Sequence, residues 1–522
     1  MGEALRLARH RQAGIVAAGG ARFALREDLA RASLLGLDAL AVRRLARPLP
    51  VVGPRTSEVG VRRRLARGAP AVVVSDRRGP IGAVGAAGVR RVQVGSSLGR
   101  RFVGSLPAPT RELIGAVGAA AVACGARAFL VGGLVRDILR GGLLAPRDLD
   151  VVIEGDGLAV ARALAAALAL PDRALVEHQR FLTASLAVPA AGRVDIVTAR
   201  AERYETPGAL PRVMPAPLLQ DLARRDFTIN AMAVELQTGD FALLDFFGGR
   251  DDLEHRRLRV LHPLSFVEDP TRIFRAARYA TRLGFRLDAW TAQARTLALG
   301  LAPYPSLSGQ RLATELELIL DDVRPPVALR HLGAAGAFRL FDPRHRFTRR
   351  TAGWIAAVPA TRDWVERHHL QAPPVEVACL ALTADQPDAV AARVLGRLGF
   401  SGAPRERLER ALAAPRPAGR PGRRVPASGR ARTLRDRSDL ELAWAWLATP
   451  ARRATLTWYV MKGRGVRPQL RGDEVAGLGV PPGPAVAAVL GALRDARLDG
   501  VVTDRGGEVA YVQHWIGLRK EG

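Results

Sequence analysis

Apolar and polar residues alternate in three ways along the chain, and each pattern predicts a different kind of structure. In about the first hundred residues, short apolar runs alternate with glycine turns and arginine-rich helical stretches, which predicts small α/β units. From residue 108 to about 250, strand-like runs alternate with helical patterns, as in a mixed α/β domain. From residue 268 onward, strand signals fade and helical periodicity takes over. One helix, expected to begin after Ser308, carries its apolar face on Leu312, Leu316, Ile319 and Leu320.

The first hundred residues contain the same strand–turn–strand pattern twice. Residues 13–16 and 21–25 form the first copy, and residues 71–74 and 80–84, joined by a turn at 76–79, form the second. The spacing of about 60 residues occurs once, whereas a solenoid needs about three or more repeats. The pattern therefore predicts a packed pair of units.

The composition is that of a folded protein with an unusual charge. Of the 522 residues, 48% are apolar and 25% charged, which excludes a wholly disordered, collagen-like or disulfide-scaffold chain; the length predicts about three or four domains. The 78 basic and 50 acidic residues leave a net charge of +28, nearly all of it from arginine, because only Lys462 and Lys520 are lysines. Guanidinium groups stay protonated and pair with phosphate oxygens, so we expect a polyanionic partner, with nucleic acid first and an anionic membrane surface second.

The cysteines and the apolar runs indicate the cellular compartment in which we expect the protein. Cys124 and Cys379 are the only cysteines, too few for a disulfide framework or a thiolate zinc site, which favours a reducing compartment. The N-terminus has no signal-type apolar core. The longest uncharged apolar run, residues 114–126, has 13 residues against the roughly 20 needed to span a bilayer. We therefore expect a soluble cytoplasmic protein that does not enter a membrane.

A glycine pair is the first candidate for chemistry. Residues 129–131 end a predicted strand, Gly132 and Gly133 form a turn, and a helix begins at about residue 134. Glycines let a backbone approach phosphate, a helix N-terminus offers free amide donors, and Arg136 can add a bidentate clamp. A glycine pair alone more often forms an ordinary turn between a strand and a helix, without a phosphate site.

Two carboxylates then begin a buried strand at residues 148–153. Asp148 and Asp150 are two residues apart, so their side chains point to the same face. Adjacent carboxylates repel unless a cation lies between them or one is protonated, and hard oxygen ligands suit Mg²⁺. Asp195, in a second apolar strand, is a weaker candidate for a third metal ligand. For an isolated pair, surface aspartates on an edge strand are the alternative.

Two further segments carry arginines beside acids. In the first, one of the two arginines, Arg224 or Arg225, can hold triphosphate or ribose, and Asp226 and Asn230, four residues apart, are expected to share a helix face; a helix N-terminus with an acidic cap is the alternative. In the second, a helix begins near Pro270 and repeats arginine every three or four residues. This stripe, with one nearby aspartate, favours an anionic ligand through self-repulsion and comprises Arg272, Arg275, Arg278 and Arg282.

Asp269 and Arg272 together can read a base. Adenine and cytosine present an amino donor beside a ring-nitrogen acceptor, whereas guanine and uracil present the opposite arrangement, so an aspartate acceptor beside an arginine donor matches A and C. A mismatched buried polar pair costs about 1–3 kcal/mol for each group, which is enough to select. The same two residues can instead form an i, i+3 salt bridge.

Taken in order, these motifs resemble the class II tRNA nucleotidyltransferase and poly(A) polymerase family. The resemblance is strong over about residues 108–345 and rests on four segments in sequence, at residues 130–137, 148–150, 224–231 and 268–272. It extends to the tail, where residues 470–473 and 478–484 are similar to the family's C-terminal segment.

The resemblance implies a polymerase-beta-like nucleotidyltransferase head with a mixed sheet, followed by an all-α neck, body and tail. By position, Asp148 and Asp150 would hold Mg²⁺, while Gly133, Arg136 and Arg225 would contact triphosphate and ribose. Asp269 and Arg272 would act as a protein template for C and A. The whole expected nucleotide-binding set is Gly132, Gly133, Arg136, Arg225, Asp226, Asn230, Asp269, Arg272, Arg275 and Arg278.

The first part of the chain resembles a pair of CBS domains. In one bacterial subgroup of the family, a DHH phosphoesterase domain and two CBS domains precede the transferase; no DHH motif precedes the CBS-like part of this sequence. The second copy lacks the acidic residue expected after its last strand, and only Asp28 is suggestive in the first. A structural or RNA-facing role is at least as well supported as adenosyl-ligand binding.

We therefore expect six parts. They are a degenerate tandem CBS-like pair (1–105), a catalytic head (106–260), a helical neck with the nucleotide-reading helix (261–345), a helical body (346–415), a linker rich in arginine, proline and glycine (416–437) and an RNA-binding helical tail (438–522). From Arg416 to Arg435 the chain has seven arginines, three prolines and no acid, so this segment is predicted to be a loop, either solvated or ordered against RNA.

The leading hypothesis is a magnesium-dependent enzyme that adds C and/or A to the tRNA 3′ end from CTP and ATP, without a nucleic-acid template. The 3′ hydroxyl would attack the α-phosphorus, and pyrophosphate would leave. A poly(A) polymerase uses the same motifs and is the second hypothesis, and a catalytically silent RNA-binding protein is the third. Whether CCA, CC or A alone is added, and the oligomeric state, stay open.

Overall fold

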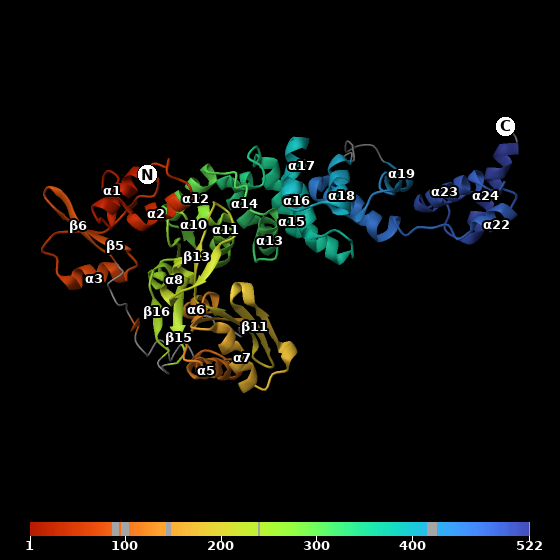
Figure 1. Cartoon of the computed structure of the whole chain (residues 1–522). Coiled ribbons are helices and arrows are strands. Elements are labelled where there is room, and N and C mark those ends of the chain that lie inside the picture. Colours follow the sequence, from red (N-terminus) through yellow and green to blue (C-terminus); the bar gives the residue numbers. More distant parts are fainter. Residues whose placement is uncertain (86–92, 95–103, 142–147, 238–240, 415–424, 521–522) are drawn as a thin grey trace. The chain divides into compact units, whose positions relative to one another are not determined.

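The structure is a computed structural model of the 522-residue chain (Figure 1). It describes residues 1–85, 93–94, 104–141, 148–237, 241–414 and 425–520. Two compact units make up the chain, Met1–Glu315 and Leu316–Gly522. Within the described residues, no helix is long and apolar enough to cross a membrane.

The N-terminal segment forms two small sheets, each with three strands. The first has the order β1-β2-β3 and the second β4-β5-β6, where β5 and β6 pair as an antiparallel hairpin. This arrangement confirms two strand–turn–strand units, while their likeness to CBS domains stays a prediction. The elements are α1 (Gly2–His10), β1 (Ile15–Ala17), β2 (Arg22–Leu25), α2 (Arg26–Leu34), β3 (Arg47–Pro48), β4 (Val51–Val52), α3 (Glu58–Ala66), β5 (Ala71–Asp76) and β6 (Gly79–Gly85).

An eight-stranded sheet forms the middle of the first unit. Its strand order is β10-β11-β12-β9-β8-β15-β16-β7. Only β9 and β12 pair in parallel, so the sheet is mixed, as the sequence predicts. The strands are β7 (Gln93–Val94), β8 (Arg127–Val131), β9 (Asp148–Glu154), β10 (Leu175–His178), β11 (Thr183–Val188), β12 (Gly192–Thr198), β15 (Met232–Glu235) and β16 (Leu243–Asp245).

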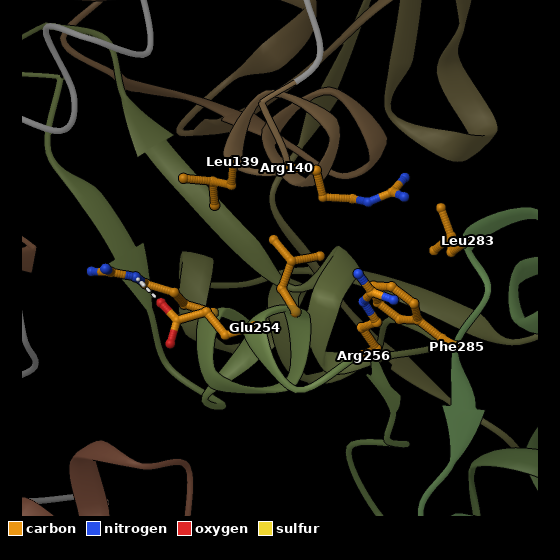
Figure 2. Close-up of a pocket in the computed structure, with 8 residues that line it drawn as sticks. Leu139, Arg140, Glu254, Arg256, Leu283 and Phe285 are labelled. Carbon is orange, nitrogen blue, oxygen red and sulfur yellow. Dashed lines mark hydrogen bonds and ion pairs between the residues drawn. The ribbon is translucent and has the colours of Figure 1, made fainter.

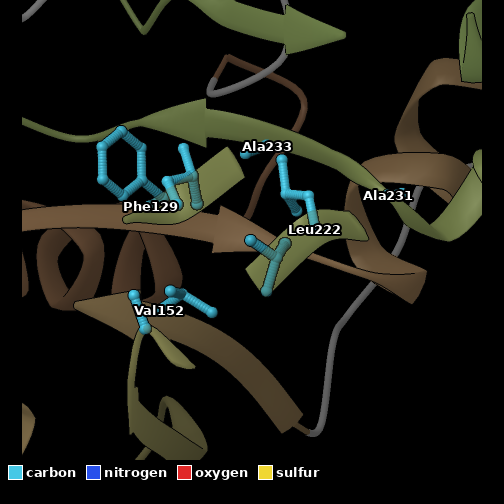
Figure 3. Packing of buried hydrophobic residues seen from close by; sticks show 8 residues of the cluster. Phe129, Val152, Leu222, Ala231 and Ala233 are labelled. Atoms are coloured by element: carbon cyan, nitrogen blue, oxygen red, sulfur yellow. The ribbon is translucent and has the colours of Figure 1, made fainter. Parts of the chain in front are cut away.

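Helices cover this sheet and fix the segments that carry chemistry. α5 (Ala108–Ala123) and α7 (Gly157–Ala167) pack together near its strands. Buried Phe129, Val152 and Ala233 of the sheet pack against Leu218 and Leu222 of α8 (Leu218–Ala223), as Figure 3 shows in part. Burial of these apolar side chains fixes α8, and with it the arginine pair that follows the helix.

The remainder of the first unit is mainly helical. α11 begins directly after Pro270 and ends at Gly284, whose φ of +69° is the left-handed conformation that glycine adopts readily at a helix end. The Ser308 hydroxyl accepts a hydrogen bond from the Arg311 amide (3.4 Å), which confirms the predicted N-cap of α13. The elements are α6 (Gly133–Leu139), β13 (Arg200–Arg203), β14 (Arg212–Pro215), α9 (Gly249–Glu254), β17 (Arg257–Leu258), α10 (Ser265–Glu268), α11 (Thr271–Leu283), β18 (Arg286–Leu287), α12 (Ala289–Gly300) and α13 (Gly309–Leu320).

The second unit is built from helices, as predicted. α15 packs against α14, α16 and α20, and a separate core near the C-terminus contains Val475, Val489, Leu493 and Val512. Its helices are α14 (Pro325–Ala335), α15 (Arg349–Arg367), α16 (Pro374–Thr383), α17 (Asp388–Arg397), α18 (Gly402–Ala413), α19 (Ala427–Arg432), α20 (Asp439–Ala448), α21 (Arg453–Trp458), α22 (Gly472–Gly477), α23 (Pro484–Leu498) and α24 (Arg505–Lys520).

The predicted linker differs from the structure in its second half. Residues 415–424 lie outside the described residues, but Ala427–Arg432 form helix α19, so the loop prediction is wrong there. Buried Ser428 donates its hydroxyl to Asp499 (2.6 Å), and Arg432 pairs with Asp495 (2.6 Å). Asp495 and Asp499, which contact this helix, lie more than sixty residues later in the chain than their partners. A local charge pattern cannot reveal such contacts.

Candidate functional site

The paired carboxylates lie at the start of β9. Asp148 and Asp150 point to the same face because they are two residues apart on a strand. The parallel register between β9 and β12 sets Asp195 opposite Asp150. Three carboxylates are thus neighbours on one side of the sheet, as the sequence predicts for the first two.

The glycine turn lies against this carboxylate face. Gly132 precedes α6 with φ +77°, a conformation that favours glycine. A Cβ atom at Gly132 would lie 3.3 Å from Oδ2 of Asp150 and 3.5 Å from Nη1 of Arg225. The absence of a side chain therefore lets the turn, the carboxylate and the guanidinium approach one another closely.

The electrostatics of Asp150 suit a cation. Burial raises the pKa of Asp150, and the carboxylates of Asp195 and Asp148 add to the rise, while the guanidinium of Arg225 acts in the opposite direction. A positive charge beside Asp148 and Asp150 would relieve this repulsion.

The donor set fits Mg²⁺ held by two carboxylates. Asp148 and Asp150 supply hard oxygen ligands, and Mg²⁺ usually keeps water and substrate phosphates for its other positions. Oδ1 of Asp195 already accepts hydrogen bonds from Arg193 Nε (2.8 Å) and from the Ser185 hydroxyl. Within the described residues no group of three or more His, Cys, Asp or Glu side chains is arranged to hold a metal.

Arg225 offers an unsatisfied donor next to these carboxylates. Its Nη2 donates to Oδ2 of buried Asp221 (3.0 Å), whereas its buried Nε has no hydrogen-bond partner among the residues that the structure describes. Asp221 also accepts two hydrogen bonds from Arg224, which pairs in addition with Glu202. Burial raises the pKa of Asp221, but Arg225 and Arg224 lower this pKa by more than burial raises it. Asp221 therefore remains an anion that holds both arginines.

Each nitrogen of the Arg136 guanidinium already donates a hydrogen bond within the protein, so Arg136 is not a free clamp for phosphate. It is buried, and its Nε and Nη2 donate to the two carboxylate oxygens of Asp137 (2.8 and 2.7 Å). Its Nη1 donates to Oδ1 of Asn230 (2.7 Å). These contacts fix the guanidinium at the first turns of α6, on the side of the predicted nucleotide-binding residues.

Asp226 and Asn230 contact each other as predicted, but the segment between them is a short 3-10 helix and not the α-helix face expected from their spacing. Asn230 lies in the short 3-10 helix Thr228–Asn230 and donates its side-chain amide to Oδ1 of Asp226 (3.0 Å). Oδ2 of Asp226 accepts from Nε and Nη2 of Arg275 (2.9 and 2.7 Å). Burial alone would raise the pKa of Asp226, but Arg275 and Asn230 lower it to about 2.

The arginine stripe of α11 is partly neutralised by acids from elsewhere, which corrects the argument from self-repulsion. Besides Asp226, Glu315 of α13 lies 3.6 Å from Arg275 and 3.7 Å from Arg278. Nε of Arg278 is buried and, in the described part of the chain, has no hydrogen-bond partner. The ring of Tyr279 lies within 5.1 to 5.6 Å of the guanidinium carbons of Arg136, Arg275 and Arg278.

Asp269 and Arg272 do not pair with each other in the part of the chain that the structure describes. Oδ1 of Asp269 accepts from the Thr271 amide (3.0 Å) and hydroxyl (2.6 Å), and Arg311 pairs with the same oxygen (2.8 Å). Arg272 is buried and donates to the Ser265 hydroxyl (2.8 Å) and the Arg224 carbonyl (2.6 Å). The alternative of an i, i+3 salt bridge is therefore not what holds them.

Sequence reasoning missed the residues that support this set. Asp221, Tyr279, Arg311 and Glu315 contact predicted site residues. Asp221 lies four residues before Arg225, and Tyr279 lies four residues after Arg275, so this spacing was a local signal for both contacts. For Arg311 and Glu315 a signal existed, because they lie four residues apart on a helix whose apolar face was evident.

The mixed sheet, with its carboxylate pair beside a glycine turn, is the head of a nucleotidyltransferase. A family model described as "Poly A polymerase head domain" matches residues 128–259. The chain is 36% identical over 394 residues to the CC-adding tRNA nucleotidyltransferase of Deinococcus radiodurans, covering 74% of this chain and 89% of that protein. It is 34% identical over 434 residues to the A-adding tRNA nucleotidyltransferase of Geobacter sulfurreducens, covering 81% of this chain and 48% of that protein.

A solved structure of a CCA-adding enzyme without ligand has a TM-score of 0.70 at 28% identity, covering 80% of this chain and 98% of that one. The chain belongs to the tRNA nucleotidyltransferase family. It spans about half the length of the A-adding relatives from Geobacter sulfurreducens and Halalkalibacterium halodurans.

Proposed function

We propose that this protein adds C and/or A to the 3′ end of tRNA from CTP and ATP, without a nucleic-acid template, and releases pyrophosphate. The observation that carries the proposal is the carboxylate pair Asp148 and Asp150 on one strand face, beside the Gly132 turn, where a Cβ would lie 3.3 Å from Asp150 and 3.5 Å from Arg225. Relatives named A-adding and CC-adding tRNA nucleotidyltransferase support the choice of substrates. Similar solved CCA-adding enzymes are complexed with ATP, with CTP and with tRNA.

Asp148 and Asp150 would hold Mg²⁺, with Asp195 as a possible third ligand. When bound, Mg²⁺ would lower the pKa of the attacking 3′ hydroxyl and stabilise charge on the leaving pyrophosphate. The raised pKa of Asp150 in the protein alone is the electrostatic reason for a cation there.

The arginines would bind and orient the triphosphate. Arg225 and Arg278 each keep a buried Nε without a partner, a costly state that a phosphate oxygen would relieve. Arg136 and Arg275 are instead held by Asp137, Asn230 and Asp226, so they would fix the shape and charge of the pocket. Such positioning supplies a large part of catalysis in phosphoryl-type transfer.

Asp269 and Arg272 would select the base. The contacts of Asp269 fall on Oδ1, which leaves Oδ2 to accept from the amino group of A or C. Arg272 is fixed by Ser265 and by the Arg224 carbonyl, so its direction is set before a nucleotide enters. A pre-set donor and acceptor reject G and U more strongly than mobile ones.

The proposal is tested with Asp148→Ala and Asp150→Ala in the full chain. Each change is expected to abolish incorporation from ATP and CTP while tRNA binding persists, because the carboxylates contribute to chemistry and not to phosphate attraction. Asp172→Ala, which removes an exposed carboxylate of the same head, is the matched control and should be fully active. Full activity of either site variant would overturn the assignment.

The product separates the remaining hypotheses. Transcripts of tRNA that end before the first C, after one C and after CC are incubated with ATP and CTP, and the 3′ ends are sequenced. Addition only to the CC-ending transcript would indicate A addition, and addition of two C residues alone would indicate CC addition. A long A tail on unstructured RNA would indicate a poly(A) polymerase, and no pyrophosphate release would indicate a silent RNA-binding protein.

A further inference from the structure

A cavity of about 560 Å³ lies at the C-terminal end of α6, outside the predicted nucleotide-binding residues (Figure 2). α6 contributes Leu139 and its C-cap contributes Arg140, α9 contributes Arg250 and Glu254, and Arg256 follows α9. Leu283 and Phe285 supply an apolar wall (Figure 2). None of these side chains has a part in the function proposed above.

The charges around this cavity are not balanced. Arg250 pairs with Glu254 (3.0 Å), which leaves Arg140 and Arg256. The carboxylate nearest to Arg140 is Asp137 at 3.9 Å, and both oxygens of Asp137 already accept from Arg136. Among the described residues, the Arg256 guanidinium has no hydrogen-bond or ion-pair partner. Two exposed guanidinium groups therefore line one cavity: within the described residues Arg256 has no carboxylate partner, and Arg140 has only the distant Asp137, which Arg136 already occupies.

The backbone at Arg256 is strained for an arginine. Its φ of +53° lies in the left-handed region, two residues after the end of α9, where glycine is the favoured residue. A non-glycine residue is strained there, because its Cβ lies too close to the following carbonyl oxygen. The position thus has an unpaired cation where the fold alone would favour a glycine.

α6 also connects the cavity to the proposed active site. The glycine turn lies at the N-terminal end of this helix, and Arg140 follows its C-terminal residue. Seven residues at 1.5 Å rise give a helix of about 10 Å. An RNA whose 3′ end reaches Asp148 and Asp150 therefore has backbone phosphates within reach of Arg140 and Arg256.

We propose that this cavity binds a phosphate of the RNA backbone through Arg140 and Arg256. The inference rests on the proposed function for the choice of RNA as the anion. A nucleotide triphosphate is the less fitting occupant, because the unpartnered donors of Arg225 and Arg278 lie in the other site. Arg140 Cζ lies 5.7 Å from the Phe285 ring centroid, so the ring supports the guanidinium while leaving its donors for an anion.

Arg256→Gly gives a test without the usual loss of stability. The change removes the cation and places glycine in a conformation that glycine favours, so thermal stability should stay equal or rise. Binding of the full chain to a tRNA lacking its CCA end, without nucleotide, is measured over a range of salt concentrations. We expect a several-fold weaker affinity and a salt dependence with a slope smaller by about one.

Two further variants make the result specific. Arg256→Lys keeps the charge and should retain most of the affinity, and Arg140→Gln should resemble Arg256→Gly. Arg173→Ala, an exposed arginine of the same unit in the 3-10 helix Asp172–Ala174, controls for loss of net charge and should leave the slope nearly unchanged.

Unchanged affinity and slope in Arg256→Gly would overturn the inference. So would a loss of ATP affinity with no loss of tRNA affinity, because the cavity would then bind a nucleotide. Incorporation by the wild-type chain at saturating tRNA is measured in parallel. If the wild type transfers no nucleotide but Arg256→Gly still binds tRNA more weakly, the proposed function fails and the phosphate site stands.

Discussion

Gly132 shows how one missing side chain can bring a site together. Its φ is +77°, and a Cβ would meet Asp150 at 3.3 Å and Arg225 at 3.5 Å. We predict that Gly132→Ala lowers stability by about 1–2 kcal/mol and strongly reduces nucleotide incorporation, because it both strains the backbone and displaces the carboxylate. Denaturant unfolding and an incorporation assay measure the two effects.

Gly125→Ala is the control for this prediction. Gly125 also has a positive φ (+64°), but a Cβ there would meet nothing within 4 Å. This variant should therefore lose a similar amount of stability and keep its activity. Equal activities of the two variants would show that the contact with Asp150 is unimportant.

The lowered pKa of Asp226 predicts the direction in which the stability of the fold changes with pH. Its pKa of about 2 in the folded protein lies below the ordinary value of about 3.9, because Arg275 and Asn230 offset the effect of burial. The ion pair therefore stabilises the fold fully above pH 4, and this contribution is lost as the pH falls from about 4 to 2. Asp226→Asn should cost about 2 kcal/mol at pH 7.

Unfolding of the wild type and of Asp226→Asn is followed between pH 2 and 7. The difference between their free energies of unfolding should be constant above pH 5 and shrink below pH 4. A constant difference across the whole range would mean that the Asp226 carboxylate does not act as the paired anion.

At the scale of residues, the sequence predicted which residues lie in the site better than it predicted which residues they contact. Strand periodicity was sufficient to align Asp148 with Asp150, and the i, i+4 spacing brought Asp226 to Asn230 even though the helix there is a 3-10 turn. Glu315, which comes from another helix, lies near both Arg275 and Arg278, in addition to the ion pair between Arg275 and Asp226. Local spacing contains no information on such a contact.

At the scale of elements, the N-terminal segment directly contacts the segment that would read the nucleotide. Arg31 of α2 pairs with buried Glu268 (2.8 Å), the last residue of α10 and the neighbour of Asp269. His262 lies 3.3 Å from the other oxygen of Glu268. Burial raises the pKa of Glu268, but His262, Arg31 and Arg272 together lower it to about 2. The first small sheet unit therefore helps to fix the segment that would select the base.

We predict that Arg31→Ala destabilises the chain and disturbs nucleotide binding together. Removing this cation leaves Glu268 buried with fewer partners, so the pKa of Glu268 should rise and stability should be lost at a higher pH during acidification. The cost at pH 7 is expected to be about 1 kcal/mol, since Arg31 is partly exposed to solvent. The KM for ATP and CTP should rise more than kcat falls.

Arg26→Ala removes an exposed arginine from the same helix and is the control. Arg31→Lys, which keeps the charge, should recover much of the wild-type KM. If Arg26→Ala and Arg31→Ala behave alike, the effect belongs to the stability of α2 and not to its ion pair with Glu268.

The elements themselves followed from the pattern, with one instructive exception. The hairpin of β5 and β6, the strands β8, β9 and β12, and the helices α6 and α11 lie where apolar periodicity, glycine turns and Pro270 predicted them. Helix α19 was missed because its arginines suggested mutual repulsion, whereas Asp495 of α23 pairs with Arg432 and Asp499, which follows α23, accepts a hydrogen bond from Ser428. Charge patterns predict exposure well only when the opposite charges are also local.

At the scale of the whole molecule, internal ion pairs do not account for the excess of arginine. Each pair removes one base and one acid, so the net charge of +28 is left unchanged by all of them. This excess must face solvent, counterions or an anionic partner. The sequence could predict its sign and its attraction to RNA, but the arginines that stay unpaired, such as Arg256, are found only from the fold.

The excess predicts a steep salt dependence of tRNA binding. Each phosphate that an arginine neutralises releases counterions, so a footprint of about six or more phosphates loses about 10³-fold in affinity between 50 and 200 mM salt. Asp148→Ala should show the same slope as the wild type, because it removes no phosphate contact. The KM for ATP should vary far less over this range, since half-buried Arg225 and buried Arg278 are screened less than exposed arginines. Filter binding and initial rates at matched salt measure both quantities, and a flat tRNA curve would mean that the excess arginine serves some purpose other than holding RNA.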